Sequence, residues 1–428
     1  MEMWSEEKPE NLSNVPQPLS KMNQQSEIVN KKFFYGWVIV AIATLSLAVS
    51  NGLSIGGIPV FYKSVQNDLV NSGAVAADRI QTVYGIAPAL TFLLAGLIAP
   101  FAGFLIQYLK ARTMMVIGCF ILGGGLALYS QAQTALIVYI SHSLLGLSLG
   151  FVGVLVSTVL ISNWFSKKRG TALGIVLTGT SIGGFMIPII STPLILDFGW
   201  RKAIIIVSLI IWLILLPAVI FLVKNQPSDI GQNVDGDSGS PLTFSNNDEY
   251  QTSGLTLLEA IKTPIFWLFS LCAALIFYAI FVVSQQLNLY AQSPKIGLTP
   301  QQASFIQSLL FSLSVAGKFA FGWLSDRFSA VKVMFFSAAT MFLSTLTFLD
   351  FNNNTVYLFA ILFGLNYGGT FVILQLLVAD YFGLKEYGKI LGAVTVIETI
   401  GGAAGTIITG RLADLNGGDY TQSFYLLI

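Results

Sequence analysis

Long apolar stretches recur along almost the whole chain, and they decide what it can fold into. A helix needs about 20 mainly apolar residues to cross a lipid bilayer, and eleven stretches of the chain meet this requirement. They lie at residues 33–59, 83–107, 113–131, 134–163, 171–196, 203–223, 264–290, 303–324, 333–349, 355–379 and 390–410. Because hydrocarbon offers the backbone no hydrogen-bond partner, such stretches must be helical. The sequence therefore predicts an all-α membrane protein.

The composition excludes several functional classes. Only 10% of the residues are charged, whereas soluble proteins carry about 25%. The formal net charge is +1, so no basic surplus predicts nucleic-acid binding. The sequence holds no Walker loop and no zinc-ligand cluster, and we therefore predict no enzyme, no cofactor and no metal site.

Two hydrophilic segments organise the chain. Residues 1–32 are polar and predict a disordered cytoplasmic tail, not a signal peptide. Residues 224–263 are rich in Asp, Gly, Ser and Asn and predict a cytoplasmic linker. The linker separates a six-helix bundle at 33–223 from a second bundle at 264–428, which has five full helices and the start of a sixth. We expect this twelfth helix to be truncated.

The distribution of lysine and arginine predicts the orientation. With a cytoplasmic N-terminus, 15 of the 22 basic residues lie in inside segments and six in outside segments, while Lys318 lies within a span. Basic residues concentrate on the cytoplasmic side of membrane proteins. We therefore expect a multi-pass protein of the plasma membrane with its N-terminus inside, present as a monomer.

A motif of glycine and charge follows two of the spans. The loop after the eighth span reads Gly322-Trp-Leu-Ser-Asp326-Arg327, and the loop after the second reads Gly103-Phe-Leu-Ile-Gln-Tyr-Leu-Lys-Ala-Arg112. In each copy a glycine lets a helix end pack closely, and charged groups follow where helix termini can hold them. The copies are half a chain apart and indicate an internal duplication, which is frequent in transporters. We predict that Gly322, Asp326, Arg327, Gly103 and Arg112 belong to gating loops.

The sequence Gly-x-Leu-x-Asp-Arg resembles the signature loop of the major facilitator superfamily, although the first copy has Gln107 where the family usually has Asp. Further stretches resemble the monocarboxylate and oxalate/formate porters of that superfamily: Tyr35–Trp37, Asn163–Gly170, Gly199–Arg201, Asn225–Gly231 and Gly410–Gly417. The resemblance implies the major facilitator fold, with two six-helix bundles around a central cavity. It also implies a secondary transporter of a small organic anion, a monocarboxylate in our interpretation, that works by alternating access with proton symport or anion exchange.

Two ionisable side chains lie deep within spans, Lys318 in the eighth and Glu398 in the eleventh. Each costs about 2.5–3.5 kcal/mol at a helix centre, so we expect a function that offsets this cost. At about 1.5 Å of helix rise per residue, Lys318 lies roughly 9 Å and Glu398 roughly 13 Å from the cytoplasmic end. These similar depths allow a direct or water-bridged pair. We predict that Glu398 couples transport to protons. The alternative is a static Lys–Glu bridge with a structural role only.

The resemblance implies a specific role for Lys318. It lies four residues before Gly322, where porters of this kind carry the cation that binds the substrate carboxylate. One cation and one acid suit a monoanion better than a dianion. Polar residues on neighbouring helix faces complete the predicted substrate site: Ser314, Asn51, Gln285 and Asn366. For the small polar residues, the alternative is hydrogen bonding between helices.

A different class of function is a non-transporting membrane sensor on the same fold. A sensor needs a signalling domain, and a 32-residue tail and a short linker do not supply one. The predicted partners are therefore a small organic anion, protons and the lipid bilayer.

Overall fold

The computed structural model describes residues 33–106, 108–236, 254–350, 352, 354–383 and 385–428. The predicted tail at 1–32 and part of the predicted linker, residues 237–253, lie outside this range. The chain divides into two units, Met1–Phe34 and Tyr35–Ile428. The second unit holds all of the described helices, and we refer to its residues 35–223 as the N-half and 264–428 as the C-half.

The N-half consists of helices alone within the described residues. They are α1 (Gly36–Asn51), the π-helical turn η2 (Gly52–Gly56), α2 (Pro59–Asn71), α3 (Ile80–Leu105), α4 (Ala111–Ser130), α5 (Ala135–Val152), α6 (Val154–Trp164), α7 (Arg169–Phe198), α8 (Trp200–Ile210), the π-helical turn η3 (Ile211–Leu215) and α9 (Leu216–Leu222). Several follow one another without a reversal, so α1–η2–α2, α5–α6 and α8–η3–α9 each make one span.

The C-half follows after two 3₁₀ turns, η4 (Pro227–Ile230) and η5 (Val234–Gly236), and the short helix α10 (Leu257–Ile261). Its elements are α11 (Pro264–Ala291), α12 (Pro300–Arg327), α13 (Ala330–Thr345), η7 (Leu346–Asp350), α14 (Thr355–Phe382), α15 (Tyr387–Leu415) and α16 (Thr421–Tyr425). Across the described chain, eleven helices are long and apolar enough to cross a membrane, which confirms the predicted spans. The first is longer than predicted, because α2 continues to Asn71 with polar residues on its surface.

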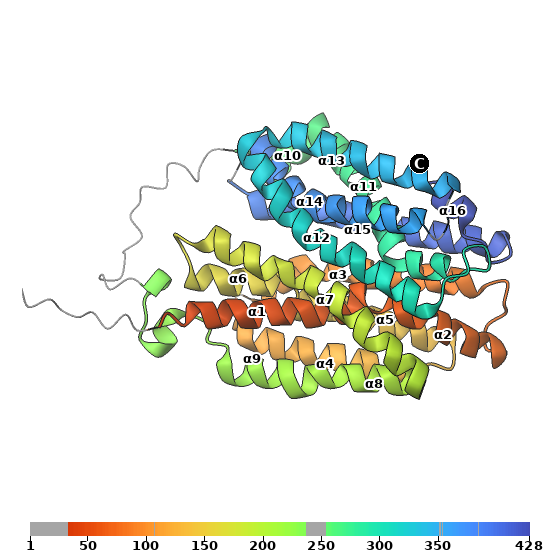
Figure 1. Cartoon of the computed structure of the whole chain (residues 1–428). Coiled ribbons are helices and arrows are strands. Elements are labelled where there is room, and N and C mark those ends of the chain that lie inside the picture. The colour runs from red at the N-terminus through yellow and green to blue at the C-terminus, as the bar shows by residue number, and fades with distance from the viewer. Residues whose placement is uncertain (1–32, 107, 237–253, 351, 353, 384) are drawn as a thin grey trace, which may run out of the picture. The chain divides into compact units, whose positions relative to one another are not determined.

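The two halves meet mainly along two pairs of helices, and α11 of the C-half also contacts α2 and η2 of the N-half. α3 packs against α15 and α7 against α12, while α1 with α7, α4 with α5, α11 with α15 and α12 with α14 pack within each half (Figure 1). The helices alternate in direction, so the turns gather at two ends. We call the end with residues 108–110, 165–168 and 223–236 the linker end, and the end with 72–79, 131–134 and 416–420 the far end.

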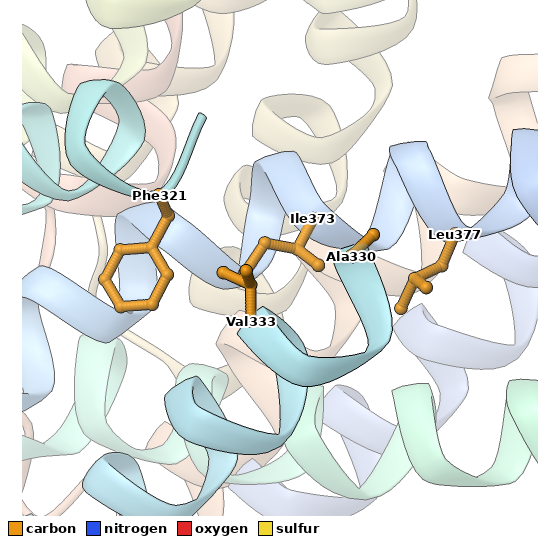
Figure 2. Packing of buried hydrophobic residues seen from close by; sticks show 5 residues of the cluster. All are labelled: Phe321, Ala330, Val333, Ile373 and Leu377. Atoms are coloured by element: carbon orange, nitrogen blue, oxygen red, sulfur yellow. The ribbon is translucent and has the colours of Figure 1, made fainter. Parts of the chain in front are cut away.

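An apolar cluster fixes the turn between α12 and α13 at the linker end. Its buried members come from three helices: Phe321, Ala330, Val333, Ile373 and Leu377 (Figure 2). Because lipid is as apolar as these side chains, close van der Waals packing supplies the stabilisation. The cluster holds the end of α12, with Asp326 and Arg327, near α14.

The start of the predicted linker is hydrogen bonded to the N-half. The Trp164 indole N–H donates to the carbonyl of Lys224 (3.0 Å). The Asp235 carboxylate accepts from the N–H groups of Ser166 (3.1 Å) and Lys167 (2.8 Å), just before α7. Residues 224–236 therefore follow the linker end of the N-half in one defined path, whereas composition alone predicted a flexible segment.

Candidate functional site

A break in the first span exposes main-chain carbonyl groups between the halves. η2 is a single π-helical turn, a feature that often marks functional sites. Pro59 begins α2 and has no N–H, so the carbonyl of Ile55 lacks its donor within the helix. The N–H of Val60 bonds to Gly57 (3.3 Å), which leaves the carbonyl of Gly56 without a helical donor as well. In a membrane such carbonyls need other partners.

Two glutamines of the C-half are those partners. Gln285 on α11 donates to the Ile55 carbonyl (3.0 Å), and its side-chain oxygen accepts from the Tyr62 hydroxyl on α2 (2.8 Å). Gln307 on α12 donates to the Gly56 carbonyl (3.4 Å). Both glutamines are buried. Gln285, which the sequence predicts as a substrate ligand, has both ends of its amide bound across the halves in this conformation.

At the far end, a carboxylate of the C-half caps a helix of the N-half. Asp414, near the end of α15, accepts from the backbone N–H groups of Gln81 (2.9 Å) and Thr82 (2.6 Å) in the first turn of α3. The N-cap residue of α3 contributes no capping side chain, so Asp414 satisfies these N–H groups and places a negative charge at the helix N-terminus. The Tyr420 hydroxyl donates to the Gln81 side chain (2.6 Å). Burial raises the pKa of Tyr420 and keeps that hydroxyl protonated.

Aromatic rings seated against glycines form the next layer toward the linker end. Phe311 on α12 is 2% exposed. A Cβ atom at Gly56 or at Gly184 of α7 would meet its ring, so only glycine leaves room for it. Elsewhere between the halves, Phe92 of α3 stacks on Phe281 of α11 with ring centroids 3.6 Å apart. The halves are therefore in direct contact through the middle of the molecule.

Lys318 lies one level further toward the linker end. Its ammonium donates to the Leu177 carbonyl (2.8 Å) and the Thr180 hydroxyl (2.6 Å), both on α7. One turn earlier, Ser314 donates to Ser181 of α7 (2.7 Å). Among the described residues, no carboxylate forms an ion pair with Lys318. Neutral acceptors of the opposite half therefore hold the Lys318 ammonium in the described structure.

Glu398 is the buried acid of the same region. It is 4% exposed, and its Oε1 atom has no hydrogen-bond partner in the described structure. The next residue, Thr399, packs so closely on Gly96 of α3 that a Cβ there would overlap its hydroxyl. The direct pair of Lys318 with Glu398 that the sequence allows is not formed within the described residues. Within the described part of the chain, neither Lys318 nor Glu398 therefore has an oppositely charged partner.

Beyond this level the facing helices separate. On α12, Gly322 lies one turn past Lys318 on the same face, and a Cβ there would meet nothing within 4 Å. The same holds for Gly174 on α7, and for Gly388 and Gly392, which continue the Thr399 face of α15. The halves are therefore closed from the far end to Lys318 and apart at the linker end, where Figure 1 shows the ribbons of α7 and α12 diverging.

Two predicted ligands have local partners. Asn366 on α14 accepts from Ser337 (3.1 Å) and Thr340 (2.8 Å) of α13 and donates to the Leu362 carbonyl (2.7 Å). Its amide links helices inside the C-half, which favours the alternative of an interhelical hydrogen bond over substrate binding. Asn51, at the end of α1, is half-buried and donates weakly to Ser50 (3.4 Å). The side-chain oxygen of Asn51 therefore remains available as a hydrogen-bond acceptor.

The predicted gating residues lie apart in this conformation. Asp326 and Arg327 are exposed, and the Arg327 guanidinium stacks on the Trp323 ring, 4.1 Å from its centroid. A Cβ at Gly103 would touch only Leu155 of its own half. The backbone N–H of Arg112 donates to Asn225 (3.0 Å). Within the described residues, none of these groups bonds across the halves, so their gating role stays a prediction for a state with a closed linker end.

Comparison with known proteins identifies the architecture. The sequence profile of the Major Facilitator Superfamily matches residues 40–295 and 293–428. The chain belongs to the Major Facilitator Superfamily. The crystal structure of a bacterial homologue of the human lysosomal transporter Spinster, in an inward-facing and unoccupied conformation, superposes with a TM-score of 0.64, at 15% identity over 90% of this chain and 83% of that one.

Relatives of the chain are named either as transporters of this superfamily or as monocarboxylate transporters. The transporter asaE of Aspergillus flavus is 26% identical over 78% of this chain and 72% of its own length. Monocarboxylate transporter 12 of Xenopus laevis is 23% identical over 92% of this chain and 85% of its own, and monocarboxylate transporter 13 of Rattus norvegicus is 24% identical over 91% and 85%. The chain is therefore a membrane transporter of this superfamily and not an enzyme.

Sequence reasoning missed the far-end contacts. The signal for the exposed carbonyls was present as Pro59, which follows two glycines inside an apolar stretch. The signal for the cap was Asp414, an acid at the end of a span, paired with an α3 that begins without a capping side chain. Nothing in the sequence says that these two helix ends, more than 300 residues apart, meet.

Proposed function

We propose that this transporter carries a small organic anion, a monocarboxylate, by alternating access, and that the anion binds at Lys318. The observation that carries the proposal is the environment of the Lys318 ammonium: one carbonyl and one hydroxyl hold it between the halves, and no carboxylate among the described residues pairs with it. A carboxylate would add the charge-assisted hydrogen bond that neutral acceptors do not supply. The names of the relatives called monocarboxylate transporters support the same class of substrate.

The conformation supports a route for the substrate. Lys318 lies where the closed region ends and the separated region begins, so a solute entering from the linker end meets the ammonium first. The basic residues counted above favour a cytoplasmic linker end. In that orientation this conformation is open to the inside and closed to the outside, and transport requires the opposite state, with the far-end contacts broken and the linker end closed.

Glu398 is our candidate for proton coupling. Its Oε1 atom is buried without a partner, so a proton on this carboxyl would remove the cost of an isolated charge. In the proposed cycle, the anion neutralises Lys318 and a proton neutralises Glu398. The loaded transporter then carries no net charge in its centre when it changes state. Anion exchange without proton transfer is the other mode, and it needs only Lys318.

Uptake of radiolabelled L-lactate into proteoliposomes tests the anion site. Lys318→Ala should abolish saturable uptake, whereas Lys318→Arg should retain a part, because guanidinium keeps the charge but changes its geometry. Ser312→Ala is a matched control, since the Ser312 hydroxyl bonds only to the Leu309 carbonyl of its own helix. Uptake by Lys318→Ala at the wild-type rate, with equal reconstitution, would show that the ammonium is not the anchor. No uptake of any carboxylate by the wild type would favour a sensor.

A further inference from the structure

A polar groove opens at the linker end of the N-half, away from the contacts between the halves. It has a volume of about 520 Å³, and its lining residues all come from the start of α4, the end of α9 and the first residues of the linker. The linker residues are held in place, because Asn225 accepts the N–H of Arg112 (3.0 Å) and its carbonyl accepts from Asn163 (3.2 Å). The groove is therefore a built feature of the N-half.

The groove concentrates positive charge. Lys110, Arg112 and Lys224 line it, against one acid, Asp229. The Asp229 carboxylate already accepts the backbone N–H of Asn225 (2.9 Å), which leaves it less available to the cations. Within the described residues, none of the three cations forms an ion pair. The N-terminus of α4 adds its partial positive charge. An anion is the chemical complement of this arrangement.

The position of the groove limits what that anion can be. It lies at the linker-end termini of the candidate spans Ala111–Ser130 and Trp200–Leu222. Two of its lining residues, Val116 and Ile220, belong to the apolar spans themselves. One wall of the groove is therefore apolar while the rim is basic. A ligand that matches both has an anionic head and an apolar tail.

We infer that this groove binds an anionic phospholipid, with its phosphate on Lys110, Arg112 and Lys224 and an acyl chain along Val116 and Ile220. Basic pockets between transmembrane helices bind anionic head groups in this way. Because α4 and α9 belong to the N-half alone, the lipid would stay bound in both transport states. The inference is independent of the substrate and of Lys318.

Native mass spectrometry of the purified full-length chain, with equal amounts of phosphatidylglycerol and phosphatidylcholine, tests the inference. The variant Lys110→Gln/Lys224→Gln should retain phosphatidylglycerol roughly 25-fold less than wild type, at about fivefold for each cation lost. Lys262→Gln/Lys332→Gln removes the same charge from exposed residues outside the groove, and it should retain the lipid as wild type does. Equal loss in both variants would reduce the effect to general surface charge and overturn the site.

A second arm separates a lipid from a free anion. In a thermal unfolding assay, sodium phosphate should raise the unfolding temperature of wild type and of the Lys110→Gln/Lys224→Gln variant equally. Free phosphate has no apolar tail to contact Val116 and Ile220, and the proposed site requires both the head group and the tail. If phosphate stabilises only the wild type, and as strongly as phosphatidylglycerol does, the groove is a site for soluble anions and the lipid assignment is wrong.

Discussion

The cap that Asp414 places on α3 should control the balance between the two transport states. In the conformation described here, the carboxylate accepts two backbone N–H groups and the hydroxyl of Thr82. These bonds must break when the far end opens, and the carboxylate then becomes hydrated. Asp414→Ala removes these hydrogen bonds from the state with a closed far end and changes the free energy of the state with an open far end very little. The substitution should therefore favour the open far end.

The expected size of the effect follows from the bonds lost. Removing a helix cap costs about 0.5–2 kcal/mol, and hydrogen bonds to charged groups contribute about 1.5–3 kcal/mol each. These terms overlap, and we expect a net shift of about 2 kcal/mol, which is about 30-fold in the equilibrium constant. A starting ratio of about 100:1 for the closed far end would fall to about 3:1. Asp414→Asn keeps one acceptor oxygen and should give a smaller shift.

Pulsed electron–electron resonance can measure this shift. Spin labels at Ala74→Cys and Gln301→Cys report the distance between the halves at the far end, since both residues are exposed and belong to opposite halves. The exposed Cys272 is replaced by Ser in the background. Asp414→Ala should add a longer distance to the distribution.

The matched control for Asp414 is Asp419→Ala. Within the described residues, the Asp419 carboxylate bonds only to the N–H and hydroxyl of Thr421 in its own turn. Asp419→Ala nevertheless removes one negative charge from the far end, as Asp414→Ala does. If Asp414→Ala and Asp419→Ala give the same distance distribution, the cap does not hold the far end closed and our reasoning is refuted.

Two further predictions address the centre and the linker end. Glu398→Gln should preserve exchange of substrate across the membrane but abolish uphill accumulation driven by a pH gradient; a variant that still concentrates substrate under an imposed gradient would exclude Glu398 as the proton carrier. Gly322→Leu should leave the thermal unfolding temperature unchanged, because its side chain enters open space here, but it should slow uptake at least about tenfold by blocking closure of the linker end. Ala316→Leu, on an exposed face of α12, serves as its control, and equal uptake by the two variants would contradict the closure argument.

The sequence predicted the properties that depend on a single helix, and it predicted contacts between two helices less well. All eleven spans were predictable, because length and hydropathy alone decide whether a helix can cross lipid. Lys318 and Glu398 stood out because a charge inside a span is costly. That Lys318 bonds to the Leu177 carbonyl was not predictable, since any residue supplies a carbonyl. Asn366 has the composition of a ligand, and only the packing of α13 on α14 reveals its interhelical bonds.

Among the residues that the structure describes, four side chains of the C-half bond to the main chain of the N-half: Gln285, Gln307, Lys318 and Asp414. A carbonyl or an N–H is present whatever residue stands at the position, so these contacts survive many substitutions at their N-half partners. Ile55 and Leu177 can change without a matching change at Gln285 or Lys318. We therefore expect weak covariation between these contacting positions among homologues, so that correlated substitutions would understate how firmly the halves are joined. One half can diverge in sequence while the other continues to recognise its backbone.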